Sequence, residues 1–201
     1  MTEITYPNGK WDARVGIVII LILITPPVRR MMESDMAFHM LLQFPLIFLA
    51  GWQLAKGLSE PVKAKLQKWN HAGITGLLLS SMILMFWMIP KALDDVLISH
   101  AMELLKFLSL ALAGVVIELS WQAAGMIMRG FFLGNVLPMM MVVGWLYIAA
   151  PVRLCNAYLA NDQLRTGSGL LALAICGSLI WLFAFFMQNA QAESASEYSE
   201  G

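Results

Sequence analysis

Apolar residues in this chain fall into long runs that short polar segments separate. The runs occupy residues 12–27, 36–55, 71–89, 100–120, 131–150 and 168–187. A helix needs roughly 17–25 predominantly apolar residues to cross the hydrocarbon core of a bilayer, and only the first run is shorter than that. The pattern therefore predicts an all-α fold, a polytopic membrane helix bundle with about six transmembrane helices.

Helices are expected rather than strands because the runs are continuous and do not alternate with polar residues. The first run ends at Pro26-Pro27 and is followed by Arg29-Arg30, so it crosses the membrane, lies flat on it or re-enters. No small-residue cleavage site follows it, and we interpret it as an anchor that stays in the mature protein. Residues 1–187 are expected to form a single transmembrane domain, and the polar tail 188–201 to be disordered.

Composition and charge restrict the function further. The chain is 59% apolar and 13% charged, whereas soluble domains are about 45–50% apolar and about 25% charged. The formal net charge is zero, so nothing in it indicates a nucleic-acid partner. The partner expected from composition is the lipid bilayer. Two cysteines, Cys155 and Cys176, are too few for a disulfide framework.

Basic and aromatic residues indicate orientation and boundaries. One predicted side carries Lys10, Arg14, Lys56, Lys63, Lys65, Lys68 and Arg129, and the other carries Arg29, Arg30, Lys91, Arg153 and Arg165. Basic residues are retained preferentially in the cytoplasm, and the concentration between 56 and 68 predicts that both termini face it. Tryptophan and tyrosine favour the membrane interface. The residues expected there are Trp11, Trp52, Trp69, Trp87, Trp121 and Tyr147.

Ionisable side chains gather at one predicted end of the bundle. If consecutive runs alternate in direction, the second and fourth runs begin in the same leaflet, whichever way the protein is inserted. The spacings of Asp35 with His39 and of His100 with Glu103 put each pair on one helix face. Ionisable groups in a span indicate a functional site. The pattern predicts a metal site with the ligands His39, His100, Asp35 and Glu103.

The same residues also have a purely structural interpretation. Asp35 and Glu103 lie in the first turns of helices, where a carboxylate complements the helix dipole. Glu103 and Lys106 have the i, i+3 spacing of an ion pair. In this alternative the cluster packs helices together and binds no ligand.

Methionine, with 15 residues, supplies a second signal. The predicted leaflet of the two histidines also holds Met31, Met32, Met36, Met40, Met85, Met88 and Met102. Thioether and imidazole ligands suit monovalent copper, so copper is the metal expected. Methionine is also a common apolar filler, as the three consecutive methionines at 139–141 illustrate.

Motifs for catalysis are missing from the sequence. It contains no Gly-rich phosphate loop, Cys-x-x-Cys, His-Glu-x-x-His or serine nucleophile elbow. We therefore do not expect an enzyme. Small residues at Gly73 and Gly76 and at Ala111 and Gly114 are spaced to let helices approach closely.

The stretch FWMIPKALDDVLISHAMELLKFLSLALAGVVIELSW, residues 86–121, resembles the core of the CtaG-like family of cytochrome c oxidase assembly factors and short prokaryotic relatives. In that family a Trp-x-x-Pro ends one helix and the next opens with histidine, often as His-x-x-Glu-His. The residues that fit are Trp87, Pro90, His100, Glu103, Phe107, Gly114 and Trp121. Leu104 stands where the second histidine of the family pattern would be.

The stretch SDMAFHMLLQFPLIFLAGW, residues 34–52, resembles the other signature of the family, a His-Met-x-x-His pair before a proline and a Leu-rich segment ending in glycine. His39, Pro45 and Gly51 fit this signature, and Asp35 occupies the position of the earlier histidine. Asp35 is then expected to ligate the ion or to orient His39.

The resemblance implies a multi-pass protein of the cytoplasmic (inner) membrane of a prokaryote. It would bind copper near the outer face and aid terminal oxidase assembly or metal handling, with oxidase subunits as partners. Two alternatives remain open from the residues. One is a non-catalytic accessory subunit of a membrane oxidase complex, and the other is a membrane haem b protein with His39 and His100 as axial ligands.

Overall fold

The computed structural model describes residues 9–200, and the side chains of residues 11–187. Over these residues the fold is entirely helical, which confirms the all-α prediction. The elements are α1 (Gly9–Ile24), α2 (Pro26–Glu33), the π-helix η1 (Phe38–Gln43), α3 (Phe44–Lys56), α4 (Glu60–Trp69), the 3-10 turn η2 (His71–Gly73), α5 (Ile74–Trp87), α6 (Pro90–Ile98), α7 (His100–Ala123), α8 (Met126–Ala149) and α9 (Ala160–Glu200).

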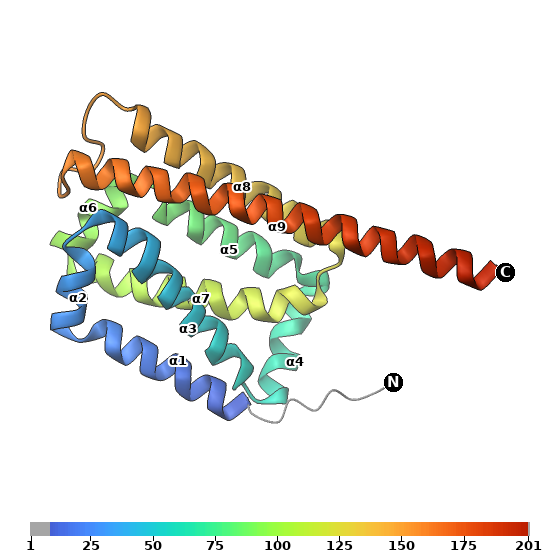
Figure 1. The fold of residues 1–201 in the computed structure, drawn as a ribbon. Coiled ribbons are helices and arrows are strands. Elements are labelled where there is room, and N and C mark those ends of the chain that lie inside the picture. The colour runs from blue at the N-terminus through green and yellow to red at the C-terminus, as the bar shows by residue number, and fades with distance from the viewer. Residues whose placement is uncertain (1–8, 201) are drawn as a thin grey trace.

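The long helices form a bundle with two distinct ends. α1, α3, α5, α7, α8 and α9 lie roughly along one direction, and each runs opposite to the one before it (Figure 1). α2 and α6 lie at one end, together with the loop 150–159, and α4 lies at the other (Figure 1). We call these the α2/α6 end and the α4 end. α7 packs against both α3 and α5, while α8 packs mainly against α9.

Several of these helices meet the requirements for crossing a membrane. Within residues 9–200, three are long and apolar enough: Phe38–Lys56, Met126–Ala149 and Ala160–Met187. Two bent pairs, Trp11–Ile24 with Pro26–Glu33 and Glu60–Trp69 with His71–Trp87, raise the number to five if each pair is one span. The chain therefore has three to five candidate spans, and the predicted six are not confirmed. α7, which carries Glu103, Lys106 and Glu118, is not among the candidates.

Proline begins several helices and bends the chain. α2, α4 and α6 each have proline at one of the first two positions, where its missing N–H costs no hydrogen bond. The residue before the proline of α2 and of α6 has non-helical backbone angles, as is usual before proline, whereas Pro45 and Pro138 lie within continuous helical segments. α1 and α2 accordingly meet at Thr25 with a bend of 74°.

Helices α3 and α7 cross at very short distance. A Cβ atom on Gly51 would lie 2.0 Å from the carbonyl oxygen of Ala111, and one on Gly114 would lie 2.0 Å from the carbonyl oxygen of Phe48. Small residues let helix backbones approach closely in membranes, where packing replaces the hydrophobic effect as the driving force. The close approach expected at Ala111 and Gly114 is thus observed, with α3 as the partner.

The hairpin of α8 and α9 relies on a similar contact. A Cβ on Gly144 would lie 2.8 Å from the Gly167 carbonyl oxygen, and a Cβ on Gly167 would lie 2.7 Å from that of Gly144. The two helices are otherwise poorly covered by the rest of the protein. Of the most apolar 18 residues, 17% are buried in α8 and 11% in α9, against 44% in Phe38–Lys56. Apolar side chains all around a helix are typical of a span that faces lipid.

Two of the aromatic residues expected at the interface lie in the core instead. Trp87 and Tyr147 are each 1% exposed. Trp87 donates from Nε1 to Ser109 Oγ at 2.8 Å, and Tyr147 donates from Oη to the Met88 carbonyl at 3.4 Å. Tryptophan and tyrosine can be buried when their polar atoms have internal hydrogen-bond partners of this kind. Trp69 at the α4 end is, by contrast, 81% exposed.

α9 continues past the last apolar run. The sequence predicts a disordered tail over residues 188–201, but the backbone of residues 188–200 belongs to α9. Alanine, glutamine and glutamate, frequent in this segment, favour helix, and extending an existing helix avoids the cost of nucleating a new one. α9 therefore projects beyond the other helices at the α4 end (Figure 1).

Asp94 fastens α6 to the loop between α8 and α9. This carboxylate is 5% exposed. Its Oδ2 accepts from the backbone N–H of Asn156 at 2.9 Å, and its Oδ1 accepts from that of Ala157 at 3.1 Å. Hydrogen bonds to an ionised acceptor are stronger than those between neutral groups. The Asp94 carboxylate thus holds two backbone amides of the loop against α6.

We expect Asp94→Ala to lower the free energy of unfolding by about 2–4 kcal/mol, because two amides lose their acceptor. Thermal denaturation of the detergent-solubilised protein measures this. Asp95→Ala is the matched control, because Asp95 is partly exposed and pairs with the exposed Lys91; a loss under about 1 kcal/mol is expected there. Equal losses in the two variants would contradict the role of Asp94.

Candidate functional site

A polar network lies at the α2/α6 end of the bundle. Glu33 at the end of α2, His39 in η1, Lys106 in α7 and Tyr158 in the loop 150–159 are joined by hydrogen bonds. These elements meet because consecutive long helices alternate in direction (Figure 1). The side chain of Lys106, at the centre, is 0% exposed. A buried ionisable group of this kind in a membrane protein indicates a functional site.

His39 is positioned by the π-helix η1. The N–H of Phe44 bonds to the carbonyl of His39, five residues back. The wider turn directs both His39 and Gln43 into the core, where each is 0% exposed. π-turns inside helices are rare and occur frequently at functional sites. The backbone distortion and the polar network therefore coincide.

The ammonium group of Lys106 is matched to three acceptors. Its Nζ donates to Glu33 Oε1 at 2.6 Å and to Gln43 Oε1 at 3.0 Å. His39 Nε2 lies 3.2 Å from the same nitrogen. A lysine ammonium has three protons and no lone pair, so Nε2 of His39 is the third acceptor. Each proton of the buried cation thus has a partner.

This arrangement fixes the protonation of the His39 ring. Because Nε2 accepts from Lys106, the proton of a neutral imidazole is on Nδ1. His39 Nδ1 lies 2.6 Å from Tyr158 Oη and therefore donates to it. Burial raises the pKa of the Tyr158 hydroxyl above its ordinary value, with the Glu33 carboxylate adding to the effect. Tyr158 consequently stays a neutral phenol that connects the loop 150–159 to the network.

Charges in the network balance. Arg29 forms an ion pair with Glu103, and its Nε lies 3.8 Å from Glu33 Oε2. The side chains of Glu33 and Glu103 are only 12% and 15% exposed. Two cations, Arg29 and Lys106, thus face two carboxylates, Glu33 and Glu103. The partner of Lys106 is Glu33 from α2, and not Glu103 as the local spacing suggests.

Not every donor in the network is matched. Among the described residues, Nε2 of Gln43 and Nε of Arg29 are buried without a hydrogen-bond partner. An unmatched buried donor is destabilising, by about 1–3 kcal/mol. The amide group of Gln43 therefore serves the network through its oxygen alone.

The four predicted metal ligands are not brought together. His39 is buried with both ring nitrogens in hydrogen bonds, whereas the side chain of His100 is 98% exposed at the first position of α7, with Nδ1 3.6 Å from Glu103 Oε2. Asp35 Oδ1 accepts from the Ala37 N–H at 2.7 Å, and Oδ2 lies 3.9 Å from Arg165 Nη1. Searched over the described residues, His, Cys, Asp and Glu form no group of three or more that is arranged to hold a metal ion.

The two histidines likewise occupy different environments, one buried in the core and one exposed. A haem iron held by both would need the two rings on opposite faces of one macrocycle. The geometry of His39 and His100 therefore gives no support to the axial pair that the haem alternative requires.

The sequence pattern singles out His39 but not the residues that His39 contacts. It indicates Lys106 only as a partner for Glu103, and it does not indicate Glu33, Gln43 or Tyr158. One signal was present, because Lys106 is a lone cation about two turns inside an apolar run, and such residues in a span usually have a buried partner. No local signal identifies Tyr158, which lies 119 residues from His39 in the chain.

Cys155, three residues before Tyr158, is held in an unreactive form. It is 1% exposed, and its Sγ lies 3.6 Å from the Pro90 carbonyl oxygen. Burial raises the pKa of the Cys155 thiol to about 12, and the Asp94 carboxylate acts in the same direction. Only the thiolate is a good nucleophile.

We expect N-ethylmaleimide at pH 8 to modify Cys155 of the folded protein roughly a thousandfold more slowly than an ordinary thiol. Site-resolved mass spectrometry of the Cys176→Ala variant measures this, because the exposed Cys176 is then absent. Unfolding in denaturant should restore rapid labelling. Rapid labelling of the folded variant would show that the loop does not bury Cys155.

The fold and this network define a helical membrane protein with a buried, charge-balanced polar site at one end. Comparison of the chain with protein-family models, with curated proteins and with solved structures gave no match.

Proposed function

We propose that this chain is a non-catalytic subunit or assembly factor of a membrane-bound oxidase, and that the Lys106 network sets the relative positions of its helices. The observation that carries this proposal is the matching of the Lys106 ammonium to three acceptors from α2 and η1. The resemblance of residues 86–121 supports the oxidase and the prokaryotic inner membrane as parts of this proposal. The loop charges support cytoplasmic termini.

The chemistry at His39 favours a structural role over metal binding. A metal ion needs the lone pair of an imidazole nitrogen, and Lys106 already uses the lone pair of Nε2. A second cation at this distance from the ammonium would also be repelled. The chain therefore supplies its own cation beside the histidine that the sequence singled out as a ligand.

The proposal is tested in the host that carries this gene. Deleting the gene should lower the amount of assembled haem–copper oxidase, read from the reduced-minus-oxidised spectrum of membranes, and a tagged copy should restore it and co-purify oxidase subunits. Copper retained by purified protein should be equal in wild type and in His39→Ala plus His100→Ala. Unchanged oxidase content after deletion, with no subunit co-purified, would overturn the proposal.

Copper handling is a second candidate, and one observation favours it. Met36, Met40 and Cys155 are 0%, 3% and 1% exposed and belong to the same core cluster. Thioether sulfur is a soft ligand that suits monovalent copper, and Cys155 would have to lose its thiol proton to join as a thiolate. In this alternative the ligands would be sulfur atoms, and not the four residues of the sequence prediction.

Loading with monovalent copper under reducing conditions separates the two candidates. If sulfur atoms hold the ion, Met36→Leu plus Met40→Leu should reduce retained copper at least about tenfold, because two soft ligands are lost. Met82→Leu is the matched control, since Met82 is 64% exposed. Retention that is the same in all three proteins would exclude this site.

A further inference from the structure

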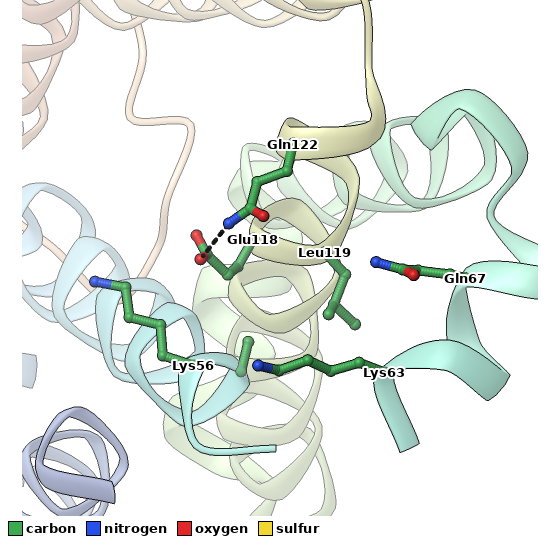
Figure 2. A pocket seen from close by; sticks show the side chains of 7 residues that line it. Lys56, Lys63, Gln67, Glu118, Leu119 and Gln122 are labelled. Carbon is green, nitrogen blue, oxygen red and sulfur yellow. Dashed lines mark hydrogen bonds between the residues drawn. The ribbon is translucent and has the colours of Figure 1, made fainter. Parts of the chain in front are cut away.

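A small polar pocket lies at the α4 end, on the opposite side of the bundle from the Lys106 network. Figure 2 shows that α3, α4 and α7 supply its walls. The lining residues are Ala55, Lys56, Lys63, Gln67, Glu118, Leu119 and Gln122. None of them takes part in the site described above. The pocket combines both signs of charge with two side-chain amides.

The surroundings of the pocket are typical of the lipid headgroup layer. α4 lies across the end of the bundle and is bent by 67° from the helix that follows it (Figure 1). Its Val62, Leu66 and Trp69 side chains are exposed, beside Lys65 and Lys68. A helix with exposed apolar and basic side chains lies in the membrane interface, and tryptophan marks the same level.

The charged groups of the pocket come from different helices. Lys56 ends α3, Lys63 projects from α4, and Glu118 lies near the end of α7 (Figure 2). Glu118 accepts from Gln122 Nε2 at 3.3 Å. Lys63 Nζ also lies 3.0 Å from Glu60, but that carboxylate is 87% exposed, and exposed ion pairs are weak. Lys63 therefore remains able to bind an anion.

We propose that this pocket binds the headgroup of phosphatidylethanolamine. The lipid phosphate would be bound by the ammonium groups of Lys56 and Lys63, and the lipid ammonium would donate to Glu118. Gln67 and Gln122 supply amide donors for the remaining phosphate oxygens. This headgroup carries one negative and one positive group, and the pocket presents the opposite charge to each.

The pocket chemistry distinguishes this headgroup from the other common ones. A choline headgroup has the same charges, but its quaternary nitrogen has no proton to donate to Glu118. A glycerol headgroup has the phosphate but no cation, so it would place a negative group beside the Glu118 carboxylate without supplying a positive one. An uncompensated charge at a partly desolvated site is unfavourable.

Native mass spectrometry of the protein in nanodiscs tests the proposal. With equal amounts of the ethanolamine, choline and glycerol phospholipids of matched chains, we expect ethanolamine lipid bound at least about fivefold over choline lipid. Glu118→Gln should bring this ratio close to one, because only the ethanolamine ammonium uses the carboxylate. Lys56→Gln plus Lys63→Gln should weaken the binding of all three lipids. Lys91→Gln, at the opposite end, should change nothing.

Several results would overturn the inference. A preference for glycerol lipid that increases in Glu118→Gln would show a simple basic surface for anionic lipid. An ethanolamine preference that survives Glu118→Gln would show that the lipid binds elsewhere. Displacement of the lipid by millimolar soluble phosphoethanolamine would show that the ligand need not be a lipid. The melting temperature of each variant is recorded beside the binding ratio, so that a folding defect is recognised.

Discussion

Gly114→Ala is expected to destabilise the protein by at least about 3 kcal/mol, although alanine is normally the better helix former. The added Cβ would lie 2.0 Å from the Phe48 carbonyl oxygen, and backbone atoms cannot rotate away as a side chain can. α3 and α7 would have to separate, which removes the contact on which the centre of the bundle is built. Thermal unfolding in detergent and size-exclusion profiles measure the effect.

Gly134→Ala in α8 is the matched control. Nothing lies within 4 Å of a Cβ built on Gly134, so the same substitution should be neutral or stabilise by up to about 1 kcal/mol. Gly51→Ala, on the α3 side of the crossing, should resemble Gly114→Ala. Equal stability of Gly114→Ala and Gly134→Ala would contradict the close approach of α3 and α7.

Lys106→Met is expected to cost about 3–5 kcal/mol, because it removes one partner from a buried ion pair. Glu33 would keep only Arg29 as a cation, at 3.8 Å. Nε2 of His39 and Oε1 of Gln43 would also lose their donor. Urea or thermal unfolding of the solubilised protein gives the free-energy change.

The double variant Lys106→Met plus Glu33→Gln distinguishes charge from shape. It removes both members of the pair, so it should recover at least about half of the loss, as replacement of whole buried pairs often does. The control is Lys91→Met, because Lys91 is 74% exposed, and a change under about 1 kcal/mol is expected. A double variant no more stable than Lys106→Met would contradict the pairing.

The long helices could be predicted because each must present about 20 apolar residues to lipid, and hydropathy detects such runs directly. The short helices α2, α4 and α6 were not predicted. They mix apolar and charged residues over eight to ten positions, which is too short for a periodic signal to separate from a loop. The six predicted spans are not confirmed, because two runs belong to helices bent at Thr25 and near His71, and because α7 is not among the candidate spans.

Local spacing predicted that His39 lies near α7 but did not predict which residue of α7 contacts it. The alternation of helices brings His39 close to α7, as expected, but Lys106 and not His100 is the residue that reaches it. Helical periodicity in the sequence cannot predict two features of the site. These are the π-turn at His39 and the pairing of Lys106 with Glu33, which lies 73 residues away in the chain. The prediction assumed regular helices and neighbouring charges, and tertiary contacts overrode both assumptions.

Interface aromatics show the same limit. Trp69 is exposed as expected, but Trp87 and Tyr147 are buried, because the polar atom of each finds an acceptor inside the bundle. Sequence position near the end of a run does not reveal whether such an acceptor exists. These two rings are therefore buried because Ser109 and the Met88 carbonyl accept their hydrogen bonds, which hydropathy does not predict.

The π-helix makes the length of one segment critical. A π-turn contains one residue more than an α-turn, because its hydrogen bonds join residues five apart and not four. Deleting the exposed Leu42 would therefore return this segment to a regular α-helix and change the direction in which His39 points, while Gln43 stayed in position. When another sequence is aligned with this chain, a one-residue gap in that sequence at residues 38–43 would consequently indicate a protein that lacks the lysine-centred network.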